Sequence, residues 1–316
     1  MRAYLIRRAV LMVPVFWGVT LFVFLAIRIV PGDVIMSQMT EGGVVDPALR
    51  EQLTRELGLD VPVHEQYLRW IAGVVHGDLG LSLVSRTPVA NEITRRVPIS
   101  AELAAIAVII ALLIGIPLGI AAAVKRDTWI DYVARFSSVV WLSVPSFVIA
   151  TSVVMLPAMW WGYSAPLGFV SVADDPVHNL EKFLPAAFAL GALLSGVITR
   201  LTRSMMLETL REDYVRTARA KGLGSRVVVV RHALKNALIP VITITGDQFA
   251  TLLGGTVIIE KIYGIPGLGT LALQSLMDKD YTVLQGVTLF FAAVFLIMNL
   301  LVDVTYGWFD PRIRYS

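Results

Sequence analysis

Long stretches without a charged residue are the feature that most restricts how this 316-residue chain can fold. Five uncharged runs are 19, 22, 38, 17 and 22 residues long and cover 9–27, 103–124, 136–173, 183–199 and 281–302. A sixth segment, 236–259, carries one charge, Asp247. About 20 mostly apolar residues are needed to cross a bilayer as a helix, and the runs lack the alternation of strands. The sequence predicts an all-α membrane protein with six transmembrane helices, at 9–30, 101–124, 135–158, 183–201, 238–259 and 284–306.

Composition agrees with this prediction. Hydrophobic side chains make up 56% of the chain and charged ones 16%, against about 25% charged in ordinary soluble proteins. A mean hydropathy of +0.71 excludes a disordered chain and disfavours a single soluble domain. The absence of cysteine excludes disulfides, iron–sulfur clusters and cysteine-ligated zinc.

The distribution of basic residues predicts how the chain is oriented. With the N-terminus inside, the cytoplasmic connections hold 17 Lys and Arg in 71 positions, and the outer connections hold 9 in 111. Basic residues concentrate on the cytoplasmic side of membrane proteins, so both termini are predicted to be cytoplasmic. The first apolar stretch is too long for a signal peptide and has no small-residue cleavage site. We therefore expect residues 1–30 to be the cytoplasmic N-terminus and first span, residues 31–98 an outer helical cap region, and residues 99–316 the membrane core.

The outer region 31–98 is predicted to contain two helices. Asp46 and Pro47 suit the start of one, which would end at Gly58, and an amphipathic pattern covers 63–75. The region is either a folded cap or a docking surface for an outer partner. Further along, the glycine- and proline-rich start of 262–277 predicts an outer turn followed by a short amphipathic helix, not a seventh span.

The cytoplasmic connection 200–236 holds nine basic and three acidic residues. Apolar side chains at helical spacing predict one helix over 205–221, ended by Gly222, with Ser225 as the cap of a second helix over 226–236. Such an element could dock a cytoplasmic partner. It could equally be a basic loop held by anionic lipid headgroups.

Six motifs appear in order along the chain: IVPGD at 29–33, GDLGLSLVSRTPV at 77–89, EDYVRTARAKGL at 212–223, HALKNALIP at 232–240, PGLG at 266–269 and NLLVDVTYGWFDPRIR at 299–314. Through these motifs the whole chain resembles the permease subunits of bacterial dipeptide and oligopeptide ABC importers. The resemblance implies the type I importer permease fold in the cytoplasmic (inner) membrane. It also implies a non-catalytic subunit for peptide uptake, without a cofactor, metal or nucleic acid on this chain.

The resemblance further implies that the loop 202–236, called the coupling loop below, contacts a separate ATPase. The residues matching the family's loop are Glu212, Asp213, Tyr214, Arg216, Thr217, Ala218, Lys221, Gly222, His232, Asn236 and Pro240. Two departures stand out: Arg216 replaces the glutamate of the general E-A-A motif, and the spacing from Gly222 to Pro240 is longer. The sequence contains no G-x-x-x-x-G-K-[ST] phosphate loop, so ATP and Mg²⁺ are expected on partner chains. The implied partners are two ATP-binding subunits, a second homologous permease, an outer substrate-binding protein and the lipid bilayer.

Asp247 is the acidic residue farthest inside a predicted span, and such a group is by default a functional candidate. We expect Asp247, Gln248 and Thr251 to line the translocation path, although Asp247 could instead pair with a neighbouring subunit. The cargo is left open, since related permeases carry nickel chelates or glutathione. A proton-coupled secondary transporter using Asp247 is a less favoured alternative, and an intramembrane protease lacks its catalytic motif.

Overall fold

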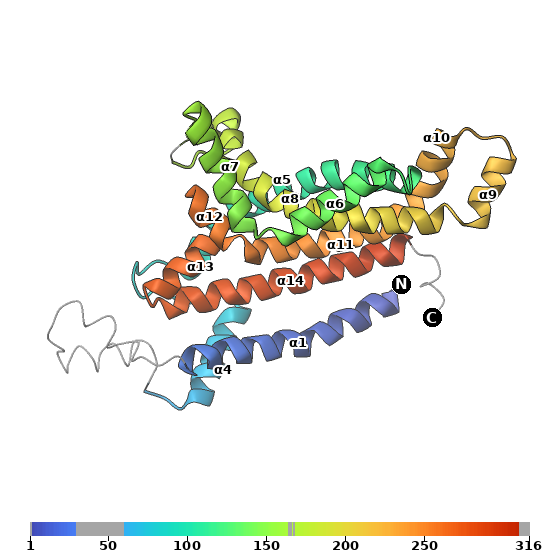
Figure 1. Cartoon of the computed structure of the whole chain (residues 1–316). Helices are drawn as coiled ribbons and strands as arrows, with labels where there is room; N and C mark the ends of the chain where they lie inside the picture. Colours follow the sequence, from blue (N-terminus) through green and yellow to red (C-terminus); the bar gives the residue numbers. More distant parts are fainter. Residues whose placement is uncertain (1, 30–59, 164–165, 167, 310–316) are drawn as a thin grey trace. The chain divides into compact units, whose positions relative to one another are not determined.

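The computed structural model describes residues 2–29, 60–163, 166 and 168–309 (Figure 1). Within these ranges the regular secondary structure is helical, and the β-type contact is an isolated antiparallel bridge between Leu81 and Pro88. The helix predicted between Asp46 and Gly58 lies outside the described residues. The helices are α1 (Arg2–Ile29), α4 (Val63–Val75), α5 (Val89–Val124), α6 (Trp129–Ser143), α7 (Ser146–Trp161), α8 (Pro176–Thr209), α9 (Asp213–Ala220), α10 (Ser225–Val227), a π-helical segment (Val228–Ala233), α11 (Leu234–Gly255), α12 (Val257–Tyr263), α13 (Leu268–Met277) and α14 (Tyr281–Phe309).

Five helices are long and apolar enough to cross a membrane, and the bent pair of α6 and α7 makes a sixth candidate. The predicted segments are thus confirmed in number, but a single helix over 135–158 is wrong, because α6 and α7 meet at 98°. Val144 is extended there (φ −89°, ψ 123°), as expected for a residue before proline, and Pro145 has no N–H to continue the helix. The third candidate span, called the broken span below, is therefore a pair of helices interrupted at Val144 and Pro145.

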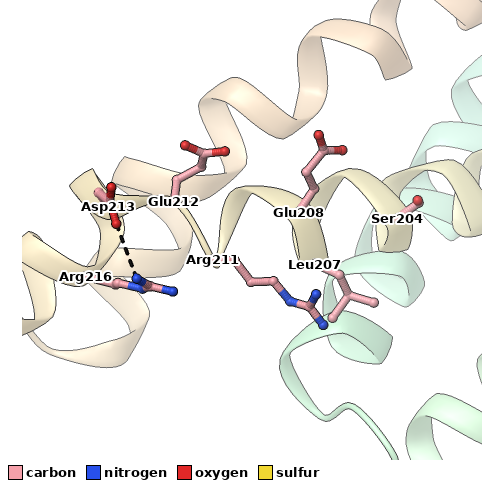
Figure 2. Close-up of a pocket in the computed structure, with 7 residues that line it drawn as sticks. All are labelled: Ser204, Leu207, Glu208, Arg211, Glu212, Asp213 and Arg216. Carbon is pink, nitrogen blue, oxygen red and sulfur yellow. Dashed lines mark hydrogen bonds and ion pairs between the residues drawn. The ribbon is translucent and has the colours of Figure 1, made fainter.

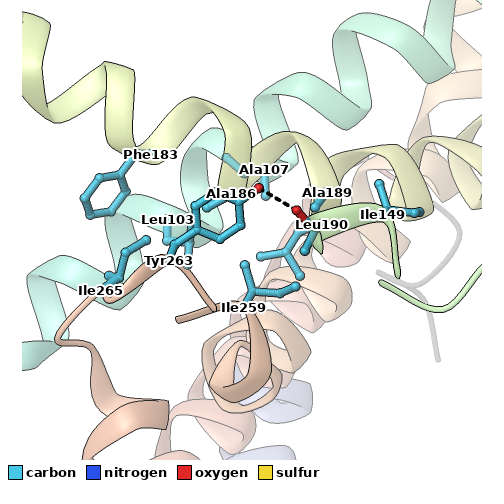
Figure 3. Close-up of a cluster of buried hydrophobic side chains, with 12 residues drawn as sticks. Leu103, Ala107, Ile149, Phe183, Ala186, Ala189, Leu190, Ile259, Tyr263 and Ile265 are labelled. Carbon is cyan, nitrogen blue, oxygen red and sulfur yellow. Dashed lines mark hydrogen bonds between the residues drawn. The ribbon is translucent and has the colours of Figure 1, made fainter. Parts of the chain in front are cut away.

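The chain forms two compact units, one of residues 99–266 and 297–309, the other of residues 2–98 and 267–296. In the first unit the main apolar cluster gathers side chains from α5, α7, α8 and α12 (Figure 3). Its largest fully buried members include Phe183 and Leu103. The Tyr263 hydroxyl donates to the carbonyl of Ala150 (3.0 Å), which ties α12 to α7, and burial raises the pKa of that hydroxyl.

Helix α8 is packed at close range by α5. A Cβ added to Gly115 would lie 2.7 Å from the Ile198 side chain, and one added to Gly119 would lie 2.6 Å from that of Thr202. On α8 itself, a Cβ at Gly191 would lie 2.7 Å from the carbonyl oxygen of Ala107. Small residues four apart allow two membrane helices to approach with their backbones nearly touching. The glycines of α5 and α8 therefore fix the distance between these helices.

In the second unit, α4 packs on α1 as its amphipathic pattern predicts. The Phe24 ring lies 5.2 Å from Tyr67 and 5.7 Å from Trp70, and the hydroxyls of Thr20 and Tyr67 are 2.9 Å apart. Val75, the last residue of α4, is exposed. The 63–75 helix is therefore confirmed, and its aromatic face is used for internal packing.

The same unit also holds the loop of the GDLGLSLVSRTPV motif. The buried carboxylate of Asp280 accepts hydrogen bonds from the Ser82 hydroxyl and from the N–H groups of Leu83 (3.2 Å) and Val84 (3.4 Å). It also caps α14 by accepting from the Val283 N–H (3.3 Å). One carboxylate thus fixes both the start of α14 and a loop nearly 200 positions earlier in the chain.

Candidate functional site

The coupling loop begins as a continuation of α8 and then turns sharply. A single helix over 205–221 is wrong, because α8 ends at Thr209 and α9 begins at Asp213. Glu212 leaves the helical region (φ −64°, ψ 147°), and its carbonyl accepts the first bond of α9 from the Val215 N–H (3.0 Å). The apolar side chains before and after the turn keep the spacing of a single continuous helix, so spacing alone could not reveal that the helix ends at Thr209.

Two buried side chains attach α9 to the rest of the unit. Val215 is fully buried and Ala218 nearly so, and both pack with Val228 and Leu210. Tyr214, the residue before Val215, is 41% exposed. Val215 was not among the predicted residues, although its spacing of three residues from Ala218 was available as a signal. The small size of Ala218 lets the helix approach closely, while its other face remains open to solvent.

Gly222 ends α9 in the conformation that glycine favours. Its φ is +77°, and the N–H groups of Gly222 and Leu223 donate to the carbonyls of Arg219 (2.9 Å) and Ala218 (3.4 Å). This pair of bonds is the Schellman arrangement, which satisfies carbonyls left open at the helix end. Nothing lies within 4 Å of a Cβ built on Gly222, so backbone conformation alone selects glycine here.

The next helix differs from the prediction in two respects. Gly224 occupies the cap position, so Ser225 is the first helical residue and makes no side-chain cap. The segment 225–255 also runs without interruption through α10, the π-helical turn and α11, although a separate helix was expected before the fifth span. Pro240 is accommodated inside α11. The second half of the coupling loop is thus an extension of a membrane helix.

Polar residues cover the open side of the turn between α8 and α9. They surround a pocket of about 520 Å³ lined by Ser204, Leu207, Glu208, Arg211, Glu212, Asp213 and Arg216 (Figure 2). Arg216 pairs with Asp213 at 3.3 Å, and both side chains are largely exposed. An exposed ion pair of this kind adds little stability, so these charges are available to a partner.

A second contact joins α9 to the start of α11. The Asn236 amide donates to the Tyr214 hydroxyl (2.8 Å), so two predicted residues 22 positions apart are brought together. Thr217 and Lys221 lie exposed on or just after α9, and the Thr217 hydroxyl donates to the Asp213 carbonyl (2.9 Å). His232 is half-buried in the π-helical segment. The structure therefore gathers most of the predicted coupling residues around one short helix.

The residues predicted to line a path lie elsewhere. Asp247 is half-buried on α11, Gln248 follows it, and Thr251 is exposed and donates to the Asp247 carbonyl (3.0 Å). At 1.5 Å per residue, Asp247 is about 16 Å along α11 from Asn236. The predicted path group and the coupling group are thus separate, and they share only the helix that carries them.

A buried acidic residue near the far end of this unit was missed. Glu260 on α12 is fully buried and accepts hydrogen bonds from Ser100 (2.7 Å) and Thr256 (2.8 Å). It escaped notice because it lies just outside the predicted fifth span. Its partner Ser100 is 160 positions away in sequence, so no local pattern connects them.

Comparison with known proteins agrees with the geometry. Residues 115–315 match the family described as binding-protein-dependent transport system inner membrane component, and residues 1–104 match the family of its N-terminal region. The chain belongs to this family. It is therefore the inner-membrane permease component of such a transporter and not its ATPase, and it crosses the membrane several times.

Among its relatives, the dipeptide transport system permease protein DppB of Escherichia coli K12 is 40% identical over the full length of both chains. The glutathione transport system permease protein GsiC of Escherichia coli O6:H1 is 38% identical over 99% of each chain. Two solved structures share the fold at 17% identity. A chain of the inward-facing MetNI methionine ABC transporter has a TM-score of 0.56 over 69% of this chain and 96% of that chain. A chain of an amino acid ABC transporter has a TM-score of 0.51 over 77% and 98%. The predicted ABC importer permease fold is confirmed.

Proposed function

We propose that this chain is the permease subunit of an ATP-driven importer of dipeptides and oligopeptides, and that its coupling loop docks on a separate ATPase subunit. The docking role is supported by the way in which α9 is attached to the rest of the protein. Val215 and Ala218 fix this short helix from one side, while its remaining side chains face solvent. A helix fixed in this way presents a defined surface without contributing to the membrane core.

The peptide cargo is supported by the relatives. The 40% identity with a dipeptide permease extends over the whole chain, including the outer region that would meet a binding protein. A glutathione permease is nearly as similar, so a tripeptide-like cargo such as glutathione is the second candidate. Both cargoes contain peptide bonds and charged ends, and a path with Asp247, Gln248 and Thr251 would offer polar groups to either.

The proposed assembly contains a second homologous permease chain, two ATP-binding subunits that hold ATP and Mg²⁺, and an outer substrate-binding protein. The cargo would enter a cavity between the two permeases, and closure of the ATPases would move the coupling loop. Such a cycle needs two states of the membrane helices whose balance is set by nucleotide.

Docking is tested by adding bulk and charge to the exposed end of α9. Ala220→Arg places an arginine on the open face, and Ala173→Arg makes the same change at an exposed loop before α8. We expect Ala220→Arg to weaken copurification of the transporter's own ATPase chains by roughly tenfold or more, as an interface clash does, and to abolish uptake. Ala173→Arg should retain both. Equal retention of the ATPase by the two variants would refute docking through α9.

Cargo and energy source are tested with the complete transporter in proteoliposomes. A labelled dipeptide, glutathione and a nickel chelate are compared for uptake and for stimulation of ATP hydrolysis. ATP-dependent dipeptide uptake supports the proposal, whereas preference for glutathione or the nickel chelate assigns the other cargo. Uptake driven by a pH gradient without ATP would overturn the importer assignment.

A further inference from the structure

A buried carboxylate links α6 to α8 at the end of the first unit that carries the coupling loop. Asp131 has no exposed surface, and the Arg203 guanidinium donates to both of its oxygens, from Nε at 2.6 Å and from Nη2 at 2.8 Å. Arg135 approaches the same carboxylate at 3.4 Å, and the Asp127 N–H donates to it at 3.1 Å. The carboxylate therefore makes four contacts with three residues, and the bidentate contact with Arg203 is the closest.

The same two helices touch again about two turns away. A Cβ added to Gly196 on α8 would lie 2.9 Å from the Ser138 carbonyl on α6 and 3.2 Å from Leu142. From Asp131 to Ser138 is seven residues along α6, and from Arg203 to Gly196 is seven residues back along α8. The equal spacing shows that the helices run antiparallel in one register. The ion pair and the glycine contact fix that register at two points.

This arrangement places Asp131 in the first half of the broken span, where α6 contacts the end of α8 that leads into the coupling loop. Arg203 lies six residues, or about 9 Å along the helix, before α8 ends and the chain turns into α9. α6 leads directly into the bend at Val144 and Pro145, beyond which α7 joins the main apolar cluster. The contact with Asp131 is therefore a point at which a displacement of the end of α8 would reach α6.

This ion pair gains little stability, because desolvation of the Asp131 carboxylate and partial desolvation of Arg203, whose side chain is 20% exposed, offset much of their attraction. Its clearest use is to fix geometry, since the planar guanidinium and carboxylate match in only a narrow range of positions. Apolar side chains at the same place would hold α6 and α8 together but would let one slide along the other. The chemistry thus favours a positional role over a purely cohesive one.

We propose that Asp131 and Arg203 are positioning residues for transport: they make α6 move with α8 when the coupling loop is displaced, so that ATP hydrolysis is converted into movement of the broken span. This proposal rests on the proposed function. It assigns to the pair a role in the efficiency of coupling, separate from docking of the ATPase and from binding of cargo.

The test measures dipeptide uptake and ATP hydrolysis in the same proteoliposomes, with the permeases, ATPases and binding protein all present. The variants are Asp131→Asn, Arg203→Gln, the double variant, and Arg203→Lys, which keeps the charge but loses the fork. Asp174→Asn is the control, because Asp174 is exposed in the loop before α8 and its side chain makes no hydrogen bond or ion pair with the described residues.

We expect Asp131→Asn and Arg203→Gln to assemble with the ATPases and to hydrolyse ATP, while the number of peptides moved per ATP falls by roughly five- to tenfold. The double variant should fall no further than either single variant, because the two groups act as one unit. Arg203→Lys should lie between these variants and the parent chain, and Asp174→Asn should match the parent.

An unchanged ratio of uptake to hydrolysis in Asp131→Asn and Arg203→Gln would overturn the proposal. So would a fall of both activities in proportion to the amount of assembled complex, since that pattern is expected of a structural pair alone. If Asp131→Asn does not assemble, the ratio in Arg203→Lys decides, and a parent-like value there also overturns it. Failure of the parent transporter to couple uptake to ATP would instead refute the proposed function.

Discussion

Replacing Val215 by alanine should release α9 from the rest of the coupling loop. The substitution removes two carbon groups from a fully buried side chain that packs with Ala218, Val228 and Leu210. At about 0.8 kcal/mol per buried CH₂, the lost transfer free energy is about 1.6 kcal/mol. The cavity left behind adds a smaller amount, so docking of α9 should weaken by about 2 kcal/mol. A change of that size raises the population of the undocked helix roughly 30-fold.

Amide hydrogen exchange of the purified permease, read by mass spectrometry over the α9 segment, measures this population. Alone, an eight-residue helix is marginal in water, so protection of its amides requires docking. The amides of Lys221 and Gly222, which donate to carbonyls inside α9, should exchange roughly 30-fold faster in the variant. Amides of the α8 interior should be unaffected.

Val230→Ala is the matched control. It removes the same two carbons from a side chain that is 55% exposed, so much less apolar area is lost from contact. Exchange in α9 should then stay within about threefold of the parent chain. If the amides of α9 are as protected from exchange in Val215→Ala as in Val230→Ala, the buried contacts of Val215 do not hold α9 in place. The proposal that α9 presents a defined docking surface would then be refuted.

Two further predictions concern packing and polar contacts. Gly119→Ala would place a Cβ 2.6 Å from a threonine Cβ on α8. This overpacking should destabilise the protein by about 1–3 kcal/mol and lower its melting temperature in detergent. Gly255→Ala is the control, because a Cβ there has no neighbour within 4 Å and should leave the melting temperature unchanged. Asp280→Asn must turn an NH₂ group toward a backbone N–H whichever oxygen the NH₂ replaces. The loop around Leu83 should therefore be destabilised by about 1–3 kcal/mol, and its amide hydrogens should exchange faster. Asp278→Asn, at an exposed site, should leave that exchange unchanged.

The membrane helices were predictable because their signal is local. A run of about 20 uncharged residues is typical of a membrane-spanning helix. Each predicted span overlaps one helix, or two consecutive helices, of the described structure. The bend in the third span was not predictable from its proline. Pro14, Pro157, Pro185 and Pro240 all lie inside helices, whereas Pro145 begins a new one. Which proline breaks a helix depends on whether neighbouring helices accommodate the turn, and that information is not in the local sequence.

The polar partners inside the first unit were invisible for a related reason. Asp131 and its partner Arg203 are 72 positions apart, and each taken alone resembles an ordinary charge at the end of a span. The sequence singled out Asp247 instead, because it is the acid farthest from any span end. Position along a span thus singled out Asp247. Which acidic residues are buried, however, depends on their pairing with residues of other helices.

Two attachments of the coupling loop lead to different expectations for its variants. α9 is held by Val228 and by the Tyr214–Asn236 contact, both leading into α11, while its chain connection runs back into α8. Force applied to α9 is therefore shared between two membrane helices. Val215→Ala should weaken the transmission of movement from α9 to both helices, and should therefore lower ATPase stimulation and uptake together. Asp131→Asn acts after α8 has moved, so it should lower uptake while hydrolysis continues. Observing the same kinetic defect in both variants would mean that Asp131 does not act in a separate step after α8 has moved.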